Sequence, residues 1–489
     1  MLGFVDETLR DGPQSLWATR MRTESMLGGT EWLNKAGFRK VCVTSGAAFE
    51  TAVKFLRDDP WERLRLLREF MPDATIDILI RSRNLFGWAR YPNDVVELLF
   101  ACLRAAGAQW VKVFDGLNDL NNIAAHFRIA RKVGLKAAGF LTFSLSPVHT
   151  DEYFARKARE LLAHGVDSIM IGDASGLLTG ERTRSLLAAV KRATGDRLPI
   201  EFVAHHSMGL AHDSYREALL AGVDTVATAC EPLANGESLP STRDILALAA
   251  ELGIETSVDA DAVRQADDYF RWVAYTEGRR IEQPAIYDPE HYRAFAGHQI
   301  PGGMMSNFRN QLKEVGMLHR LDEVLEEASR VRTEIGYPIM VTPFSQFVGV
   351  QATFNVIQGE RYKTVPHELR LYALGHYGEP PAPIDPNVLD RILDGKSADR
   401  IDLDAAFEEP LLERLRQEQG PFRSDEELLL QLFYGRDHVD ALRREKTSFD
   451  QGPTVRQPLH ALVQQLSRET TLKTVKLEKR SLKLNLSFS

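Results

Sequence analysis

Arginine, carboxylate and carboxamide side chains gather directly after short apolar runs in the first half of this sequence. Arg10 and Gln14 follow the run FVDETL, and Arg81 and Arg83 follow the run IDILI. The other polar or reactive side chains at the ends of such runs are Asp11, Asn84, Asp115, Asp173, His205, His206, Cys230, Glu231, Asn235 and Glu237. Guanidinium groups beside a carboxamide suit a planar carboxylate or a 2-oxo acid, because arginine can bind it through two parallel hydrogen bonds. Salt bridges between loops are the alternative role for any single arginine.

Two of these side chains could also bind a divalent metal ion. Asp11 and His205 have suitable donor atoms, but two ligands are only half of a tetrahedral set. His206 follows His205 on an extended segment, so the two imidazoles should point to opposite faces unless the strand has already ended. The residues alone therefore leave a metal site open and do not establish it.

The apolar runs have the number and spacing of a closed barrel. They are FVDETL (4–9), VCVTS (41–45), IDILI (76–80), VKVFD (111–115), AAGFLTF (137–143), SIMIGD (168–173), IEFVAH (200–205) and TVATAC (225–230). Helical patterns lie between them, and eight strand-helix units in about 250 residues predict a (β/α)8 barrel. An open doubly wound sheet would usually have a glycine-rich phosphate turn after its first strand, which DETLRDGPQS is not.

The strand pattern stops near residue 286. Apolar residues at helical spacing in MLHRLDEVLEEASRVR, and a further helical portion after the proline-rich GEPPAPIDP, predict a mainly helical second domain. The segment LKTVKLEKRSLKLNLSFS alternates leucines with polar residues, which suggests either a β-hairpin that contacts a partner or a frayed basic tail. We therefore expect a barrel domain over 1–285, a helical domain over 286–445 and a C-terminal tail over 446–489.

Composition narrows the class of protein. The chain has 489 residues, of which 44% are hydrophobic and 26% are charged, with a net charge of −8. These values are typical of a soluble globular protein, and nothing in them points to nucleic acid as a partner. The three cysteines are too few and scattered for a disulfide framework, and MLGFVDETLR lacks the pattern of a signal peptide. No stretch approaches about 18 uncharged apolar residues, so we expect a cytoplasmic protein without a transmembrane segment.

Longer segments carry a resemblance to a known family. They are LRDGPQSLWATRMRTE (9–24), AAFETAVKFLRDDPWERLRLLRE (47–69), RYPNDVVE (90–97), SPVHTDEY (146–153), HQIPGGMMSNFRNQLKEVG (298–316), GYPIMVTPFSQFVGVQATFNV (336–356) and GERYKTVPHELRLYALGHYGEPPAPIDP (359–386). Over about residues 2–400 the chain resembles the carboxyltransferase module of pyruvate carboxylase and the alpha subunit of oxaloacetate decarboxylase. The resemblance implies an α/β fold, a (β/α)8 barrel followed by a helical domain, as the periodicity does.

The resemblance also implies a metal site, which this sequence keeps only in part. Members of the family hold a divalent metal through an Asp, a carbamylated Lys and two His, and the metal acts as a Lewis acid on an enolate. Asp11 matches the Asp and His205 the second His, while Gly172 stands at the Lys position and Val203 at the first His position. Because glycine and valine have no donor atom, a bound divalent metal (Zn, Mn or Mg) is doubtful.

The substrate side of the family pattern is better kept. Gln14 and Arg81 match residues that bind the 2-oxo acid, with Arg10 and Asp115 as supporting neighbours. We expect Arg83 to assist in substrate binding. Trp88 replaces an expected Tyr, and Glu237 stands where the resemblance places a proton-shuttling Thr. The expected catalytic side chains are thus Arg10, Asp11, His205 and Glu237, where Glu237 would be either a general base or a charge that repels the ureido oxygen of biotin.

Three functions fit these features. The first is a divergent carboxyltransferase or decarboxylase that acts on a 2-oxo acid such as pyruvate or oxaloacetate, with biotin supplied on a separate carrier protein. The second is a non-catalytic structural or regulatory subunit of a biotin-dependent carboxylase complex, together with a biotin carboxylase or an active paralogue. The third is a metal-independent 2-oxo acid lyase that uses His205 or His206 as its base. Family members are usually homo-oligomers, so self-association is expected in all three.

Overall fold

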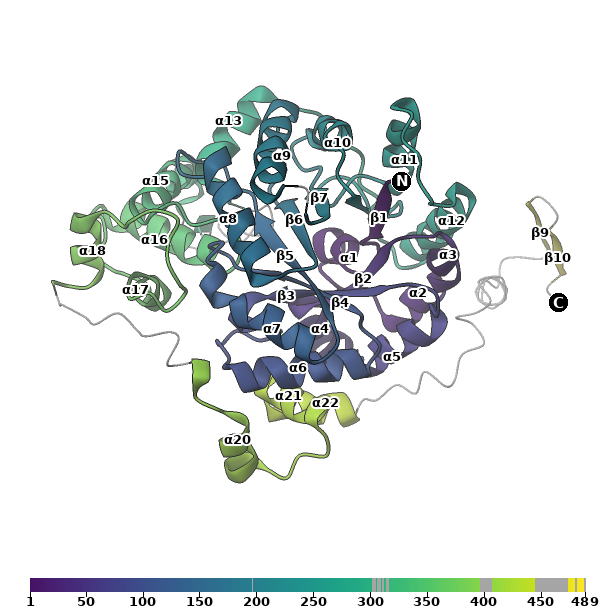
Figure 1. The fold of residues 1–489 in the computed structure, drawn as a ribbon, viewed down its shortest axis with the longest axis horizontal. Helices are drawn as coiled ribbons and strands as arrows, with labels where there is room; N and C mark the ends of the chain where they lie inside the picture. Colours follow the sequence, from purple (N-terminus) through teal and green to yellow (C-terminus); the bar gives the residue numbers. More distant parts are fainter. Residues whose placement is uncertain are drawn as a thin grey trace.

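Eight parallel strands close into a barrel, and helices surround it (Figure 1). The computed structural model describes residues 1–195, 197–300, 305, 309, 312–313, 316–395, 407–444, 474–479 and 482–487. The strands are β1 (Gly3–Asp6), β2 (Lys40–Ser45), β3 (Ile76–Arg81), β4 (Trp110–Phe114), β5 (Lys136–Thr142), β6 (Ser168–Asp173), β7 (Ile200–Ala204) and β8 (Thr225–Thr228). Every one of the eight apolar runs contains a strand, and the predicted (β/α)8 barrel is confirmed.

Among the strands that end before their apolar runs, β1 and β7 matter most for the mouth of the barrel. The Asp6 carboxylate accepts hydrogen bonds from the amide and the hydroxyl of Thr8, so the chain turns there and the short helix α1 (Asp11–Leu16) follows. Strand β7 ends at Ala204, which places His205 in the loop beyond it. Both shortened ends lie at the carboxyl side of the barrel, where loops carry function in this fold.

Helices cover the outside of the barrel. They are α2 (Thr23–Leu27), α3 (Thr30–Lys35), α4 (Gly46–Thr51), α5 (Pro60–Phe70), α6 (Asn93–Ala105), α7 (Ala124–Lys132), α8 (Asp151–His164), α9 (Gly180–Thr194), α10 (Ala211–Leu220), α11 (Thr242–Glu251) and α12 (Ala260–Thr276). Hydroxyl side chains at Thr150, Thr179 and Ser241 accept amide hydrogen bonds in the first turns of α8, α9 and α11. These caps fix where the helices begin, and so they fix the lengths of the loops at the mouth.

A second core follows the barrel. It is built by α15 (Leu321–Glu334), α16 (Phe344–Gln358), α17 (His367–Ala373) and α18 (Pro386–Ile392), which lie to one side of the barrel in Figure 1. The preceding helix α13 (Pro289–His298) lies against α15, while its Phe295 belongs to the barrel core. Buried apolar side chains such as Val324, Phe347 and Tyr372 form the centre of this second core. The predicted helical second region is therefore present, and Leu117 from the loop after β4 joins its core to the barrel.

The last helices return to the barrel. They are α20 (Leu412–Gln419), α21 (Asp425–Tyr434) and α22 (Arg436–Arg444), and α21 lies against α6 (Figure 1). Buried Leu429 and Phe433 belong to the core of the barrel and not to that of α15–α18. The Tyr434 hydroxyl also donates to the carbonyl of Phe86 at 3.0 Å. The predicted domain over 286–445 thus contains two sets of helices: one set forms the second core, and the other packs on the barrel core.

Two further strands form an antiparallel pair near the end of the chain. They are β9 (Thr474–Lys479) and β10 (Leu482–Ser487), with Leu484 opposite Leu477. The rest of the tail predicted from residue 446 lies outside the described residues. Within the described residues, no helix is long and apolar enough to cross a membrane.

A leucine of α21 tests whether the last helices stabilise the barrel. We expect Leu429→Ala to lower the free energy of unfolding of the barrel by about 2–5 kcal/mol, because the fully buried side chain leaves a cavity in the barrel's own core. Chemical denaturation followed by tryptophan fluorescence measures the change. The control is Leu220→Ala, whose side chain is 59% exposed on α10 and should cost little. Equal effects of the two variants would contradict the packing of α21 on the barrel.

Candidate active site at the mouth of the barrel

The side chains that follow β1 and β7 meet at the mouth of the barrel. The Nε2 atom of His205 lies 3.4 Å from Oδ1 of Asp11, and the Ser238 hydroxyl donates to Oδ2 of Asp11 at 3.2 Å. Arg10 donates to the same carboxylate through Nη1 at 2.8 Å. Asp11 is buried, and its oxygens are held from three sides. The structure thus brings together three of the four predicted catalytic residues: Arg10, Asp11 and His205.

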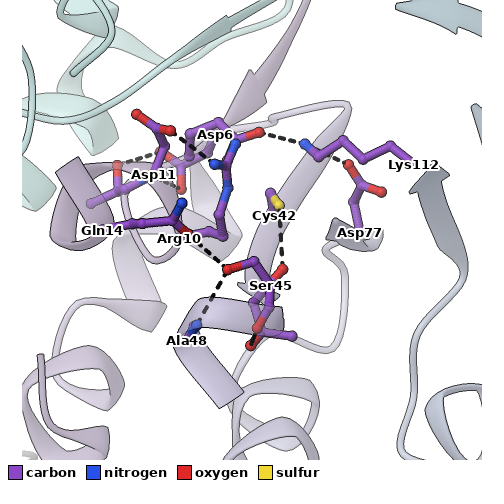
Figure 2. Close-up of polar contacts among 12 residues, drawn as sticks. Asp6, Arg10, Asp11, Gln14, Cys42, Ser45, Ala48, Asp77 and Lys112 are labelled. Carbon is purple, nitrogen blue, oxygen red and sulfur yellow. Dashed lines mark hydrogen bonds and ion pairs between the residues drawn. The ribbon is translucent and has the colours of Figure 1, made fainter. Parts of the chain in front are cut away.

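A chain of buried ion pairs leads from the barrel interior to this cluster (Figure 2). Lys112 of β4 pairs with Asp77 of β3 at 3.0 Å and with Glu7. Glu7 accepts from Nε of Arg10 at 2.7 Å, and Arg10 pairs in turn with Asp11. Their side chains are 8% exposed or less. Each charge therefore has an opposite charge beside it in a region with little water to screen it.

The ion pairs set the protonation of the cluster. Burial alone raises the pKa of Asp11, but the positive charges of His205 and Arg10 outweigh burial and hold this pKa well below its ordinary value. Burial lowers the pKa of His205, whereas the neighbouring Asp11 carboxylate raises it, and the net pKa is raised. Asp11 is therefore a carboxylate, and His205 favours its protonated form more than a free imidazole does.

Gln14 lies beside this cluster on α1. Its side-chain oxygen accepts a hydrogen bond from the Ser45 hydroxyl at 2.8 Å, and Ser45 also accepts from the amide of Ala48 (Figure 2). The hydrogen bond from Ser45 fixes which end of the carboxamide is the oxygen. The side-chain amide nitrogen of Gln14 is then the donor available to a ligand, as a role in carboxylate binding requires.

Arg81 ends β3 at the mouth. Its Nη2 donates to the carbonyl of Gly87 at 2.6 Å, and its guanidinium lies 4.8 Å from the ring centroid of Trp88. Trp88 is 50% exposed and donates through Nε1 to Glu50 at 3.0 Å. Burial lowers the pKa of Arg81, although nearby Glu50 partly offsets this effect. The guanidinium is thus oriented by a carbonyl and an aromatic ring, and no carboxylate among the described residues forms a salt bridge with it.

Arg83 lies in the turn that follows β3. It is part of the short 3₁₀ turn Ser82–Asn84, donates to Asn93 at 2.5 Å and lies 4.2 Å from the ring centroid of Phe407. The structure does not bring it to the cavity that Arg81 lines. Arg90, which the sequence pattern does not single out, lies in that cavity, and its guanidinium is 4.8 Å from the centroid of the same Phe407 ring.

Asp115 lines this cavity, and both of its carboxylate oxygens accept hydrogen bonds. Oδ1 accepts from the amides of Leu117 and Asp119, and Oδ2 accepts from the Ser82 hydroxyl and the Asn122 amide. Burial, together with the charge of Asp119, raises its pKa. Asp115 therefore organises the loops after β3 and β4.

The positions of the two missing family ligands are filled by apolar side chains. A Cβ atom on Gly172 would lie 2.0 Å from the ring of Phe140, so no side chain fits there unless Phe140 moves. Phe140 packs with Val5, Met170 and Val203 inside the barrel, and with Phe114 at 5.9 Å between ring centroids. Among the described residues, no group of three or more His, Cys, Asp or Glu side chains could hold a metal. The site does not fit the family's metal.

The remaining candidates are spread around the mouth. Asp173 accepts from the amides of Ser175 and Leu178, and burial raises its pKa to about 6. His206 donates its backbone amide to Ser238 and its side chain does not join the Asp11 cluster. Glu237 is exposed in the loop after β8. Glu237 therefore differs in exposure from buried Arg10 and Asp11 and from partly buried His205.

Glu231 and Asp267 lie outside the mouth. Glu231 pairs with Arg271 at 2.8 Å, and Asp267 lies 3.9 Å from Arg243 on the buried face of α12. The Asp267 side-chain oxygens are buried and have no hydrogen-bond partner among the described residues. Burial raises the pKa of Asp267 from the ordinary 3.8 to about 7.

Comparisons with known proteins place this geometry in a family. Residues 296–484 match the model of a family described as a conserved carboxylase domain. A pyruvate carboxylase subunit of Methanocaldococcus jannaschii is 38% identical over 451 residues, which cover 91% of this chain and 78% of that relative. The chain belongs to the carboxyltransferase family of pyruvate carboxylase. The resemblance found in the sequence is confirmed.

Other members of the carboxyltransferase family extend the range of named activities. The methylmalonyl-CoA carboxyltransferase 5S subunit of Propionibacterium freudenreichii is 36% identical, with 79% of this chain and 76% of the relative covered. The carboxyl transferase domain of Rhizobium etli pyruvate carboxylase, solved with pyruvate and biocytin, has a TM-score of 0.82 and 26% identity, and covers 93% of this chain and 78% of that chain. The barrel and the helical region are thus the shared framework of the family.

Sequence reasoning missed Phe140, Arg90 and Phe407 as residues of the site. Phe140 stands in AAGFLTF directly after three small residues, which leave space for its ring. Arg90 opens RYPNDVVE, where the spacing gives no sign of a role at the mouth. Phe407 lies more than 300 residues from the arginines it contacts, and no local pattern could have linked them.

Measuring the metal content of the protein tests whether apolar side chains close the metal-ligand positions of the family. We expect the purified protein to lack stoichiometric zinc or manganese by elemental analysis. Gly172→Lys with Val203→His should not restore metal binding, because the new Lys would meet the Phe140 ring. Adding Phe140→Ala should allow binding, since it opens the space that the Lys needs. Stoichiometric metal in the unaltered chain, or in the double variant, would show that Phe140 does not close the site.

Asp267 gives a prediction for the pH dependence of stability. Its pKa is raised in the folded chain, so the unfolded chain releases this proton near pH 4 and the folded chain near pH 7. Stability is therefore lost between these values as the pH rises. Asp267→Asn should raise the free energy of unfolding on the order of 2–4 kcal/mol at pH 8, with little effect near pH 4. Denaturation curves at both pH values check this, with exposed Asp213→Asn as the control. A constant difference across pH would exclude a titration of Asp267.

Proposed function

We propose that this chain is the carboxyltransferase-type subunit of a biotin-dependent complex, moving or removing a carboxyl group on a 2-oxo acid such as pyruvate or oxaloacetate. The observation that carries the proposal is the combination of 38% identity to a pyruvate carboxylase subunit over 91% of the chain with the retained Arg10, Asp11, Gln14 and Arg81. In this proposal, biotin reaches the site on a carrier protein.

The substrate would be bound by Arg81 and Gln14. Arg81 offers guanidinium N–H groups that no carboxylate of the described residues neutralises, and Gln14 offers its side-chain amide nitrogen. A carboxylate and an adjacent oxo group together need several donors in one plane, which a guanidinium and a carboxamide supply. Binding at this place holds the reacting carbon atoms near the cluster of Asp11 and His205.

His205 would donate a hydrogen bond or a proton to the enolate that the reaction forms. Oδ1 of Asp11 lies 3.4 Å from Nε2 of His205, so the N–H at Nε2 faces Asp11 and orients the ring. Loss of a carboxyl group beside a carbonyl leaves an enolate, and the protonated imidazole would donate its other N–H, at Nδ1, to the enolate oxygen. No step is assigned to a metal, because Phe140 and Val203 occupy its place.

The mouth also has a surface that suits biotin. Trp88 is 50% exposed, yet Arg81 and Glu50 hold its ring in place, which gives a flat apolar surface beside the substrate arginine. The fused rings of biotin are uncharged and fit such a surface, and biotin on its carrier would accept or deliver the carboxyl group. A structural neighbour at 26% identity was solved with pyruvate and biocytin, which supports the same arrangement.

A non-catalytic role is the second candidate, and Phe140 is the observation that favours it. A protein that keeps its fold and interfaces but fills its metal position could serve as a structural or regulatory partner of an active paralogue. The partners in either case would be a biotinyl carrier and a biotin carboxylase, with self-association of the chain.

Turnover with a carrier separates the two candidates. We expect the chain to release carbon dioxide from oxaloacetate, or to carboxylate pyruvate, when a biotinylated carrier domain is present. Arg81→Ala should raise KM for the 2-oxo acid by about 10- to 100-fold, because charge-assisted hydrogen bonds to the carboxylate are lost. Exposed Arg128→Ala on α7 serves as the matched control. Absence of turnover with a native carrier, together with recovery of a complex, would favour the structural role.

A further inference from the structure

The loop after β3, residues 82–91, carries Trp88 and contacts Arg81 directly. Nη2 of Arg81 donates to the carbonyl of Gly87 at 2.6 Å, and the Arg81 guanidinium lies 4.8 Å from the ring centroid of Trp88. One residue of the loop thus orients the guanidinium through its backbone, and the next does so through its side chain. The conformation of this β3 loop therefore determines where the guanidinium and the indole lie at the mouth.

The β3 loop has a strained backbone. Ser82 and Leu85 have φ angles of 35° and 52°, in the left-handed region that residues with a Cβ atom rarely adopt. Strain of this kind persists only where the surrounding structure holds the chain in place. Contacts from outside the loop are therefore needed to keep its shape.

Helix α21 makes such a contact through its last residue. The Tyr434 hydroxyl donates to the carbonyl of Phe86 at 3.0 Å. The next residue of the loop is Gly87, whose carbonyl accepts from Arg81. Burial, together with the nearby Glu50 carboxylate, raises the pKa of Tyr434 well above its ordinary value, so the hydroxyl keeps the proton that it donates. Two consecutive carbonyls thus connect Tyr434 to Arg81.

The preceding residue of α21 packs on the same loop. The ring centroid of Phe433 lies 6.4 Å from that of Phe86 and 5.1 Å from that of Tyr91, and all three rings are buried. Both contacts have the edge-to-face arrangement that stabilises aromatic pairs. Phe86 also packs on Phe49 of α4, with 4.4 Å between ring centroids. The β3 loop is therefore held between a helix of the barrel and α21.

A second set of contacts connects α21 to Trp88. Nζ of Lys54 lies 5.8 Å from the ring centroid of Tyr434 and pairs with Glu50 at 2.7 Å. Glu50 accepts in turn from Nε1 of Trp88 at 3.0 Å. Trp88 is thus connected to Tyr434 through side chains, as Arg81 is through the backbone.

We propose that Tyr434 is a positioning residue, which acts through the β3 loop to keep Arg81 and Trp88 in their places at the mouth. The inference rests on the proposed function, because that function assigns Arg81 to the 2-oxo acid and Trp88 to biotin. It goes beyond that function in giving α21 a part in ligand binding, although Tyr434 touches neither ligand and lies 348 residues after Phe86 in the chain.

Hydrogen–deuterium exchange of the full-length chain tests whether Tyr434 holds the loop. Tyr434→Phe removes the hydroxyl and keeps the ring, so it isolates the hydrogen bond. The amides of Leu85, Gly87 and Tyr91 donate within the loop, and mass spectrometry of peptides from residues 82–91 reports their exchange. We expect at least about tenfold faster exchange of these amides in Tyr434→Phe, because a carbonyl of the loop loses its buried donor.

Tyr269→Phe on α12 is the matched control. The Tyr269 hydroxyl also donates to a backbone carbonyl at 3.0 Å, that of Ser25, and Tyr269 belongs to the same barrel core as Tyr434. This variant should destabilise the chain to a similar extent and leave exchange in the β3 loop unchanged. If Tyr434→Phe does not fold, Phe433→Leu is the second variant. It keeps an apolar side chain but loses the ring contacts, so we expect the same local opening.

Kinetics with a biotinylated carrier and pyruvate or oxaloacetate separate positioning from stability. Tyr434→Phe should raise KM for the 2-oxo acid about three- to tenfold and change kcat by less than about twofold, because Arg81 is displaced while the cluster of Asp11 and His205 is not. Tyr269→Phe should leave both constants within about twofold. A loss of folded protein would instead lower kcat at constant KM.

The outcomes distinguish this inference from the proposed function. Unchanged exchange of residues 82–91 in Tyr434→Phe overturns the inference and leaves the proposed function standing. Faster exchange with an unchanged KM also overturns it, since the loop would then open without displacing Arg81. If the unaltered chain converts no 2-oxo acid, the proposed function fails, and the exchange measurement still decides whether Tyr434 holds the loop.

Discussion

The alternating charges inside the barrel are the constraint on which the mouth depends. Asp77, Lys112, Glu7, Arg10 and Asp11 follow one another with opposite signs, from the middle of the barrel to the first loop. In a region of low dielectric, each charge is tolerated because its neighbours compensate it, and the loss of one member would leave a costly unpaired ion. This mutual dependence fixes the position of Arg10 and Asp11, and through Asp11 the ring of His205. The chemistry of the mouth is therefore anchored in the barrel interior.

Charged and apolar side chains both occupy the barrel interior. The ion pairs that reach the mouth connect side chains of β3, β4 and the end of β1, whereas Phe140, Met170 and Val203 pack together on β5, β6 and β7. Another buried ion pair joins Lys40 of β2 to Glu201 of β7 at 2.6 Å, so the apolar cluster does not take up a whole half of the barrel. The resemblance places metal ligands on β6 and β7, and there Phe140 fills the space beside Gly172 and Val203. Arg81, which we propose binds the substrate, ends β3, the strand that also carries Asp77 of the ion-pair chain.

Much of this was accessible from sequence because the determining patterns are local. Eight apolar runs specified eight strands, and the position of Arg81 and Asp115 at the ends of two runs placed them at the mouth. Arg83 lies in the 3₁₀ turn after β3 and contacts Asn93 and Phe407, and spacing alone does not reveal these neighbours. The sequence predicted a helical portion that runs to about residue 445, but a helical pattern does not state which surface covers its buried face. The ring of Phe140 on β5 occupies the space beside Gly172 on β6. This contact joins residues on two neighbouring strands, so no local sequence pattern predicts it.

The return of α21 and α22 to the barrel has a consequence for the order in which the chain can fold during synthesis. The barrel strands leave the ribosome first, yet the rings of Phe86 and Tyr91 are covered by Phe433, with centroids at 6.4 and 5.1 Å. For the time needed to translate about 200 further residues, this patch beside the substrate arginine faces solvent or a chaperone. After all eight strands have been synthesised, the loop after β3 therefore still exposes apolar rings to solvent. The loop acquires its final neighbours only when the last helices emerge, so the substrate side of the mouth is among the last parts of the molecule to mature.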